Sequence, residues 1–378
     1  MKSKSQQVNT KRDLPDGPLN VRMQREPCGS AARSNNLAEE GGLSPARFNS
    51  HARACVGSRC FSPAELAHTG RRWTELLDAH GEGDLRQKCP NPIGKGCRPL
   101  AAPPVACYNT SQKRPAKMPV GLCLIPAVPR RGILPSCSGS GGQESFILHS
   151  FFRQHLLKNV SHRGTFLEVG ANNGVNSNTL HLEVCLGWRG VLVEGHPATF
   201  ELLRHNRPRA LVVSSAMCRT HGTVAYTSGA LPTAGILASS SPRQRIIWRN
   251  RTTSVPCGPL SDWLRLLRMS HIDFFSLDVE GAQRLVLCSM DWTSISVSVL
   301  VVECKAVGCT NADDDEIAYL LEAQGFIRLA SLRVRHDVWD AAYGNRTWMS
   351  IHGISTVPSH LKAGKCVRRN NFCTINGV

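Results

Sequence analysis

The chain has 378 residues, 41% of them hydrophobic, and a formal net charge of +17, which gives room for about two domains. Most of this charge lies in residues 1–140, where 21 Lys or Arg stand against 10 Asp or Glu. Because this basic segment lacks interleaved aromatic residues and a dense Lys/Arg block, we predict no specific nucleic-acid binding, and no stretch is long and apolar enough to predict a transmembrane segment.

Residues 1–140 are predicted to form a poorly structured segment. Gly, Pro, Ser, Cys and Arg dominate it, and no hydrophobic period is sustained except a weak helical patch from Pro63 to His80. A segment without a repeating apolar face has little surface to bury, so we expect little folded core there.

The cysteines leave the compartment open. The sequence has 16 of them but no CxxC pair, and the spacing of Cys55 and Cys60 without a paired Cys/His set argues against a zinc finger. We expect disulfides only if the chain is secreted, and its N-terminus has no apolar signal core. The default prediction is a soluble, cytoplasmic protein, with organellar and secretory-pathway locations left open. Four glycosylation sequons would be available in the secretory case, at Asn109, Asn159, Asn250 and Asn345.

Apolar residues recur at regular intervals from Gly142 onward. Glu144 to Leu157 predicts an amphipathic helix, and strands then alternate with helices, which is typical of a parallel sheet with right-handed crossovers. The predicted strands are Gly164 to Val169, Gly190 to Glu194, Ala210 to Ser214, Ile272 to Leu277 and Val297 to Val302. The predicted helices are Val175 to Leu186, Ala198 to His205, Pro259 to Leu267, Ala282 to Cys288 and Asp313 to Ala323.

Arg219 to Pro256 interrupts this alternation. It contains two short β-like pieces, Thr223 to Thr227 and Arg245 to Trp248, and a loop rich in Ser, Pro and Gly. We interpret this stretch as an insertion near the carboxyl edge of the sheet.

The end of the alternating part predicts a closing antiparallel hairpin, from Phe326 to Leu329 and from Val334 to Trp339. The predicted fold class is therefore α/β, a doubly wound sheet of about seven strands. We place this sheet domain at residues 141–345, after the 1–140 segment, and assign residues 346–378 to a tail.

The turn after the first predicted strand has the composition of a nucleotide-cofactor site. Gly170 and Gly174 allow backbone conformations closed to larger residues and let a ligand approach the main chain, whose amides could bind a carboxylate. A dinucleotide fingerprint would need glycine where Asn172 stands, and Glu168 would repel a diphosphate. The cationic methyl donor S-adenosylmethionine (SAM) fits instead. Glu168 could face its ammonium group or order the loop, and Glu194 could accept its ribose hydroxyls.

Asp278 and Glu280, where the fourth strand ends in LDVEG, are the predicted catalytic pair. Residues two apart on a strand share a face, so both carboxylates can face one crevice. One could take a proton from an acceptor hydroxyl or position it, and both could hold a divalent cation. The structural alternative is that Asp278 caps the next helix and Glu280 pairs with Arg284. No acid follows the third strand, so Ser215, Met217 or a backbone carbonyl is predicted to contact the adenine.

Other residues are weaker candidates for the site because no motif supports them. Glu303 and Asp262 could help line the pocket, whereas His196, although it could approach the adenine, is more typical of a surface loop. Trp188 and Trp292 are predicted to be packing aromatics.

Several separately spaced segments carry a resemblance to a known family. They are GQESFILHSFF, GTFLEVGANNGVNSNTLHLE, GWRGVLVEGHP, NRP and IDFFSLDVEGAQRLVL. Over roughly Gly142 to Leu329 the sequence resembles the FkbM-type SAM-dependent methyltransferases. The resemblance implies a class I methyltransferase Rossmann-like fold, SAM as donor and, most often, methylation of an oxygen on a small molecule or sugar.

The resemblance also assigns residues. It implies that the donor site holds Glu168, Gly170, Asn172, Gly174 and Glu194, and that Asp278 and Glu280 lie at the catalytic edge. Gln283 stands where the family often has a second carboxylate, and Gly195 where it often has proline.

Two other interpretations stay open. One is a methyltransferase-like domain without turnover that serves as an adaptor or cargo-binding module, which the resemblance allows for some secretory-pathway members. The other, a nicotinamide dehydrogenase, ranks low because the middle glycine of its fingerprint is missing.

Overall fold

The computed structural model describes residues 28, 44–81, 123–124, 136–137, 143, 147–152, 163–354, 367–369 and 372–374, with gaps at 176, 181, 184–186, 228–232, 306 and 334–338. The chain divides into two units, Met1–Leu37 and Ala38–Val378. Only Cys28 is described in the first unit, so the description below concerns the second.

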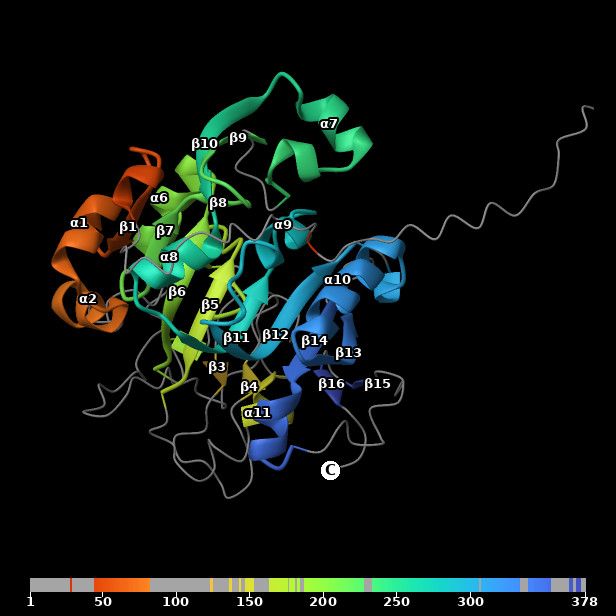
Figure 1. The fold of residues 1–378 in the computed structure, drawn as a ribbon. Coiled ribbons are helices and arrows are strands. Elements are labelled where there is room, and N and C mark those ends of the chain that lie inside the picture. Colours follow the sequence, from red (N-terminus) through yellow and green to blue (C-terminus); the bar gives the residue numbers. More distant parts are fainter. Residues whose placement is uncertain are drawn as a thin grey trace, which may run out of the picture. The chain divides into compact units, whose positions relative to one another are not determined.

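A nine-stranded sheet forms the centre of the second unit (Figure 1). Its strands, in spatial order, are β13 (Phe326–Arg333), β14 (Trp339–Asn345), β12 (Ser296–Cys304), β11 (His271–Leu277), β5 (Thr165–Val169), β6 (Arg189–Glu194), β7 (Leu211–Ser214), β1 (Arg53–Val56) and β2 (Arg59–Phe61). The five strands from β12 to β7 are parallel, whereas β14 and β1 run antiparallel to the strands beside them. This is the predicted doubly wound α/β sheet with its antiparallel hairpin.

The strand order reverses between β5 and β11. From β5 the chain builds outward through β6 and β7, then returns to add β11 and β12 on the other side. In such sheets the ligand crevice lies outside the carboxyl ends of the strands at this reversal. The fold therefore puts the turn after β5 and the loop after β11 at the expected place for a site.

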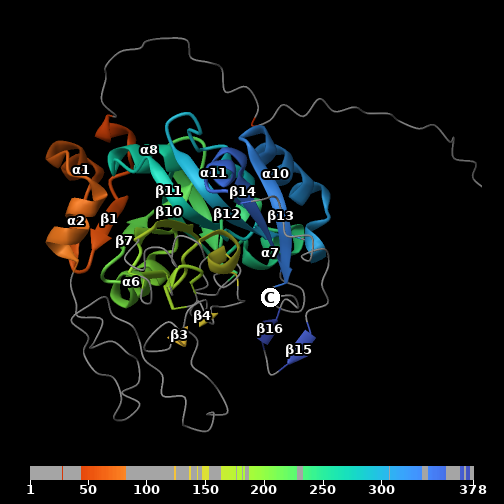
Figure 2. The same ribbon diagram turned by 90° about the horizontal axis from the view of Figure 1, so that it is seen from below.

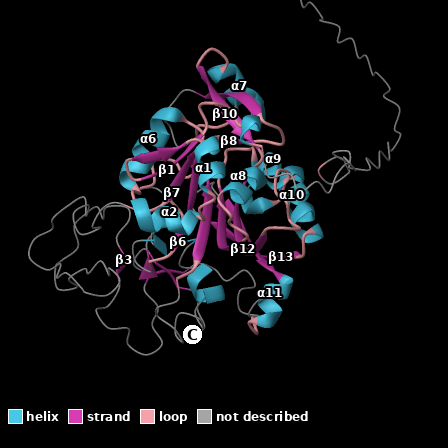
Figure 3. Ribbon diagram, turned by 60° about the vertical axis from the view of Figure 1, so that its left-hand side comes forward, coloured by secondary structure: helices cyan, strands magenta, loops and turns pink. Residues whose placement is uncertain are grey.

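Helices flank the sheet (Figures 2 and 3). In Figure 2, α8 and α10 lie on one side of the sheet and α6 on the other. The helices are α1 (Pro63–Thr69), α2 (Trp73–His80), α6 (Pro197–Asn206), α7 (Pro242–Trp248), α8 (Leu260–Leu266), α9 (Gln283–Leu287), α10 (Ala312–Ala323) and α11 (Arg346–Ile351). Short one-turn elements are η1 (Pro45–Arg47), η2 (Leu148–Phe152), η3 (Leu237–Ser239) and η4 (Val307–Cys309).

The central strands are buried on both faces, as helices on each side require. Phe166, Phe274 and Val299 on neighbouring strands are inaccessible to solvent and pack in one core with Phe200 of α6 and Phe152 of η2. Strands covered on two sides read as continuous apolar runs, which is why the sequence pattern located them.

Residues 44–81 are folded onto the sheet, which differs from the expectation of little core before residue 140. β1 pairs with β7, so that Ala54 lies opposite Val213. Ala54 and Cys55 are completely buried, and Cys55 forms a disulfide with Cys60 across the β1–β2 hairpin. Strands of four and three residues are too short to give a recognisable period, so only the helical patch was predicted.

The insertion forms a second, three-stranded sheet of β8 (Ala216–Met217), β10 (Thr252–Gly258) and β9 (Gly222–Thr227). The predicted β-like piece Arg245 to Trp248 is wrong, because it belongs to helix α7. Ser241 caps this helix by accepting from the Gln244 backbone N–H, and Pro242 occupies its first turn, where its missing N–H costs nothing.

Some predicted elements are shifted or lie outside the described residues. The second hairpin strand is Trp339–Asn345, later than the predicted Val334 to Trp339, and residues 334–338 are outside the description. Only parts of the helices predicted at 144–157 and 175–186 are described. Two further hairpins pair β3 (Cys123–Leu124) with β4 (Ser136–Cys137) and β15 (Val367–Arg369) with β16 (Phe372–Thr374).

Within the described ranges, none of the helices has the length and apolar character needed to cross a membrane.

The β1–β7 pairing can be tested by introducing a charge. Ala54→Asp would put an unpaired carboxylate into a fully buried site, so we expect it to lower the free energy of unfolding by at least about 2 kcal/mol in urea denaturation. Ala64→Asp, on the exposed side of α1, is the matched control and should change it little. Equal stabilities of the two variants would mean that residues 44–81 do not pack on the sheet.

Candidate active site

The turn after β5 is held against both neighbouring strands. The backbone N–H groups of Gly170 and Ala171 donate to the carbonyl oxygen of Val193 at 3.0 and 3.1 Å, and the Asp278 N–H donates to the carbonyl of Val169 at 3.0 Å. Gly170 has φ = +90°, and a Cβ atom there would overlap the carbonyl oxygen of Asp278. Only glycine therefore lets the turn after β5 lie directly against the loop after β11.

Glu168 orders this turn, which is one of the two roles predicted for it. Its carboxylate accepts hydrogen bonds from the Ser177 hydroxyl at 2.6 Å, the Thr179 hydroxyl at 2.6 Å and the Asn178 N–H at 2.9 Å. Burial raises the pKa of Glu168 above its ordinary value, and Arg207 only partly offsets this. With three donors from one loop, Glu168 is a positioning residue here.

Arg207 belongs to the same hydrogen-bond network, because it contacts Ser177. This arginine is 1% exposed, pairs with Glu183 at 2.6 Å and donates to the Ser177 hydroxyl at 2.8 Å. A Cβ at Gly174, which has φ = +76°, would lie 2.6 Å from the Arg207 Cγ atom. Gly174 is thus required by the packing of an arginine as well as by its backbone conformation.

Glu194 ends β6 and binds the turn from the other side. One carboxylate oxygen accepts from the Asn172 N–H at 3.0 Å and the other from the His196 N–H at 2.7 Å. Burial raises the pKa of Glu194 to about 7, against the lowering effect of these backbone donors. A carboxylate oxygen can accept more than one hydrogen bond, so Glu194 keeps acceptor capacity for a hydroxyl pair.

The backbone amides of the turn are less available than the sequence suggested. Each N–H from Gly170 to Val175 has an acceptor within the protein. Three of these acceptors are side-chain oxygens: Glu194 accepts from the Asn172 N–H, Asn172 from the Asn173 N–H, and Asn173 from the Val175 N–H. In the conformation described, an amide of residues 170–174 would have to leave its present acceptor before it could bind a carboxylate.

A cleft lies beside the turn, between β5, β6 and the insertion. Ser215 lines it, but its hydroxyl donates to the carbonyl of Ala216 at 2.8 Å. Tyr226 of β9 also lines it, and its ring lies 2.8 Å from where a Cβ at Gly195 would be. Gly195, which replaces the family's proline, therefore makes room for Tyr226. Sequence reasoning missed Tyr226, because nothing in a β-like piece of the insertion indicates that it folds back over the sheet.

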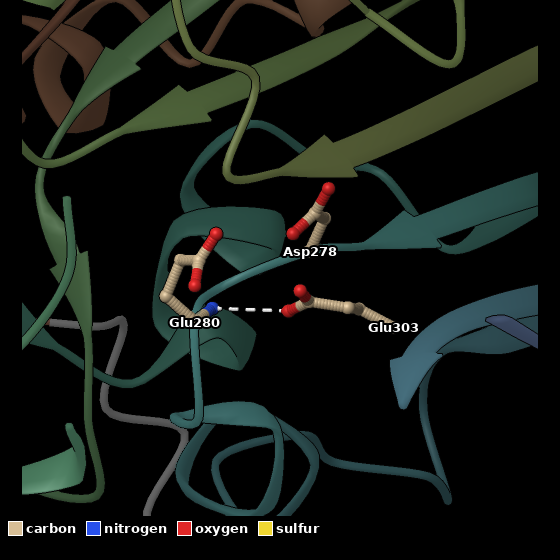
Figure 4. A group of neighbouring side chains, drawn as sticks. All are labelled: Asp278, Glu280 and Glu303. Atoms are coloured by element: carbon tan, nitrogen blue, oxygen red, sulfur yellow. Dashed lines mark hydrogen bonds between the residues drawn. The ribbon is translucent and has the colours of Figure 1, made fainter. Parts of the chain in front are cut away.

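Three carboxylates gather at the ends of β11 and β12. Ligand atoms of Asp278, Glu280 and Glu303 all lie within 4.8 Å of one another, and Figure 4 shows them turned toward a common space. The Glu280 N–H donates to a carboxylate oxygen of Glu303 at 3.3 Å. Asp278 is accessible to solvent although protein surrounds it closely, as expected of a group at the floor of a crevice.

Burial and mutual repulsion make these acids hold protons near neutral pH. The pKa of Glu280 is raised to about 7 and that of Glu303 to about 8, first by burial and then by a neighbouring carboxylate. The pKa of Asp278 is raised well above its ordinary value by burial and by Glu303. A raised pKa of this kind suits a group that exchanges a proton near pH 7.

The structural alternative for Asp278 and Glu280 is wrong. Helix α9 has Ala282 at its N-cap and no side-chain cap, so Asp278 does not cap it. Arg284 pairs with Glu316 at 2.7 Å. Among the described residues, no Lys, Arg or His forms an ion pair with Glu280, so neither acid is engaged in helix capping or in a surface salt bridge.

Two glutamines support the carboxylates. The side-chain amide of Gln283 donates to Glu303 at 3.1 Å, so the departure from the family's carboxylate supplies a neutral donor to the cluster. Asp340 of β14 lies opposite Glu303 in the sheet and accepts from Gln143 at 2.7 Å. Gln143, part of the GQESF motif, is thus brought to the site from far along the chain.

Of the less specific candidate residues, one lies at the carboxylate cluster and the others have structural roles. Glu303 joins the site, but Asp262 pairs with His221 at 2.8 Å and Arg265 at 2.9 Å. His196 is buried and caps α6, accepting from the Thr199 N–H, so the expectation of a surface residue is wrong. Trp188 is 1% exposed in the core, as predicted.

A divalent cation could in principle be held by the three clustered carboxylates, whose oxygen ligands suit Mg²⁺. No observation of this structure requires one, so metal dependence stays a prediction.

Strand order and motif positions together define the class. The sheet order, the glycine turn after β5, the acid ending β6 and the carboxylates after β11 are those expected of a class I SAM-dependent methyltransferase fold. Residues 168–328 match the methyltransferase FkbM domain, which confirms the resemblance. Residues 168–328 are thus similar to the SAM-dependent methyltransferase domains of the FkbM type.

Solved structures with weak overall similarity include other methyltransferases. The Aeropyrum pernix fibrillarin with bound SAM is 12% identical with a TM-score of 0.29, over 52% of this chain and 73% of that one. The METTL16 methyltransferase domain is 14% identical with a TM-score of 0.34, over 59% and 70%. A Geobacter metallireducens precorrin-6y C5,15-methyltransferase is 9% identical with a TM-score of 0.26, over 50% and 85%. No curated protein matches the sequence.

The raised pKa values predict a pH-dependent stability. The folded chain keeps protons on Glu280 and Glu303 at pH values where the unfolded chain, with pKa near 4.5, has lost them. Stability should therefore fall as the pH rises from about 5 to 8. Glu303→Gln removes part of the repulsion, so we expect its unfolding midpoint to rise at pH 8, by roughly 2–4 °C for each kcal/mol gained, and to change little at pH 5.

Differential scanning calorimetry at both pH values measures this effect. Glu322→Gln, an exposed acid on α10, is the control and should show no such pH-dependent difference. A Glu303→Gln variant destabilised equally at both pH values would contradict the proposed repulsion.

Proposed function

We propose that the protein transfers the methyl group of SAM to a hydroxyl oxygen of a small-molecule or carbohydrate acceptor. The observation that carries this proposal is the group of accessible, proton-exchanging carboxylates, Asp278, Glu280 and Glu303, in direct backbone contact with the donor turn. A hydroxyl acceptor needs a base to remove its proton, whereas a more acidic or already nucleophilic acceptor does not.

The donor would lie across the carboxyl ends of β5 and β6. Glu194 would accept hydrogen bonds from the ribose hydroxyls, and the cleft beside it, lined by Val193, Met217 and Ile236, would give apolar surface to the adenine. Rotation of the Asn172 and Asn173 side chains would free two backbone N–H groups of the turn for the donor carboxylate. Glu168 would hold the turn in shape without touching the donor.

The chain's part in the reaction is to align and deprotonate the acceptor. When bound, SAM supplies a methyl carbon on a positively charged sulfur, which leaves as a neutral thioether. A carboxylate of the cluster takes the acceptor's proton while the acceptor oxygen forms the new bond to carbon. Asp278 is our candidate base because its backbone contacts the donor turn directly, and burial together with Glu303 and Asp340 keeps its pKa high.

The second candidate, an adaptor or cargo-binding module without turnover, would be expected in the secretory pathway, and the disulfides bear on that location. The disulfides Cys55–Cys60, Cys218–Cys257 and Cys304–Cys309 have Cα separations of 4.0, 5.8 and 5.2 Å. They favour the secretory-pathway location over the cytoplasmic default. They do not favour loss of activity, because Cys304–Cys309 follows Glu303 directly and helps to fix it.

The donor site can be tested through Glu194. Glu194→Ala removes the hydroxyl acceptor, so we expect SAM affinity to fall by about 1–3 kcal/mol, roughly 5- to 150-fold, in equilibrium dialysis. Glu201→Ala on the outer side of α6 is the matched control. Unchanged affinity in Glu194→Ala would remove this residue from the donor site.

The base can be tested through Asp278. Asp278→Asn should lower single-turnover methyl transfer by about 10²-fold or more while SAM affinity stays within about twofold, because only the proton acceptor is lost. Asp313→Asn, exposed on α10, is the control, and each reaction is run with and without Mg²⁺. Full activity of Asp278→Asn would overturn its assignment, and activity abolished by chelation would show that the carboxylates act through a metal.

A further inference from the structure

The insertion carries an exposed surface that the methyl-transfer site does not use. We call it the tip surface, and it consists of Arg243, Arg245, Ile246, Ile247, Arg249 and Arg251, on α7 and the turn that follows it. In Figure 1 helix α7 stands at the outer end of the insertion, beyond β9 and β10.

Two adjacent isoleucines dominate the apolar part. Ile246 is 70% exposed and Ile247 is 56% exposed. Capping by Ser241 and the proline after it holds these side chains in a helix, whereas a strand would have placed successive residues on opposite faces. Exposed β-branched residues side by side leave apolar area in water, which favours removal into an apolar environment.

The charged part is purely cationic. The sequence has no Asp or Glu between Glu201 and Asp262. All four arginines of the tip surface are exposed, and none has an ion pair among the residues that the structure describes. Their charge is therefore available to an external anion when Asn250, the sequon between Arg249 and Arg251, carries no glycan.

The tip surface is coupled to the acceptor site through the insertion. Helix α7 packs on η3, and the carbonyl oxygen of Ser239 in η3 lies 2.5 Å from the position that a Cβ atom would take at Gly281. The Glu280 Cβ atom lies 3.1 Å from the corresponding position at Gly235. The insertion thus rests directly on the loop that carries the catalytic carboxylates.

We infer that the tip surface docks the protein on an anionic lipid bilayer. Arginines attract acidic headgroups, and isoleucines between them can enter the boundary of headgroups and acyl chains, a combination typical of interfacial helices. A nucleic acid would use the arginines but give the exposed isoleucines no partner. The tip surface has no acid for a basic protein partner to contact.

Docking would bring the crevice to the membrane surface. The acceptor part of this inference, a hydroxyl on a lipid headgroup or at the bilayer surface, rests on the proposed methyl transfer, whereas the docking part does not. The acceptor part narrows the proposed acceptors to molecules whose hydroxyl group lies at a membrane surface.

Co-sedimentation of the full chain with vesicles tests the docking. Vesicles are made of phosphatidylcholine alone or with about one third phosphatidylglycerol, at about 0.1 and 0.5 M NaCl. We expect binding only to the anionic vesicles at low salt. Ile246→Ser/Ile247→Ser and Arg243→Gln/Arg245→Gln/Arg249→Gln should each lower the partition coefficient by about tenfold or more.

Two controls separate a local surface from net charge. Arg71→Gln/Arg163→Gln/Arg209→Gln removes the same charge from exposed positions elsewhere, and Ile351→Ser removes an isoleucine that is 75% exposed on α11. Both should bind vesicles as the parent chain does.

The inference is overturned if the parent chain does not bind anionic vesicles, or if the arginine control loses binding as strongly as the tip variant. It is also overturned if the isoleucine variant keeps full binding while a duplex or single-stranded oligonucleotide binds through the same arginines. SAM affinity is measured on every chain, so a parent chain that binds SAM but not anionic vesicles rejects the docking alone and leaves the proposed methyl transfer standing.

Discussion

The site depends on the direct contact between the turn after β5 and the loop after β11. Gly170 allows this contact because a larger residue would overlap the Asp278 carbonyl, and the Asp278 N–H bonds back to Val169. Since the two strands are neighbours at the reversal of strand order, the residue that shapes the donor turn and the residue proposed to remove a proton are fixed to each other by backbone. The distance between donor and acceptor is therefore set by the sheet and not by a mobile loop.

Electrostatics divides the acids of the site into two kinds. Glu168 and Glu194 are buried with several donors each, so they act on the shape of the turn and on the placing of a donor. Asp278, Glu280 and Glu303 crowd together at the crevice, where their like charges raise one another's pKa. Keeping such a cluster destabilises the fold above neutral pH, a cost that is typical of functional sites.

Much of the architecture could be predicted because parallel strands covered on both faces are continuous apolar runs, and these located β5, β6, β7, β11 and β12. The glycines and acids next to them were then placed by the strand ends. Short or irregular pieces could not be predicted: β1 has only four residues, and Tyr226 reaches the cleft through an insertion with no recognisable period. Arg245 to Trp248 looked extended because Ile, Ile and Trp favour strands, but the Ser241 cap and Pro242 start a helix there.

Calorimetric titration of the full chain with SAM, with NAD as the comparison ligand, tests most directly whether this crevice is a methyl donor's site. The full chain is needed because β1 completes the edge of the sheet beside β7. We expect saturable binding of SAM at one site and no binding of NAD. A demonstrably folded chain that does not bind SAM, or that binds NAD in its place, would contradict the assignment of the β5 turn and Glu194 to the donor.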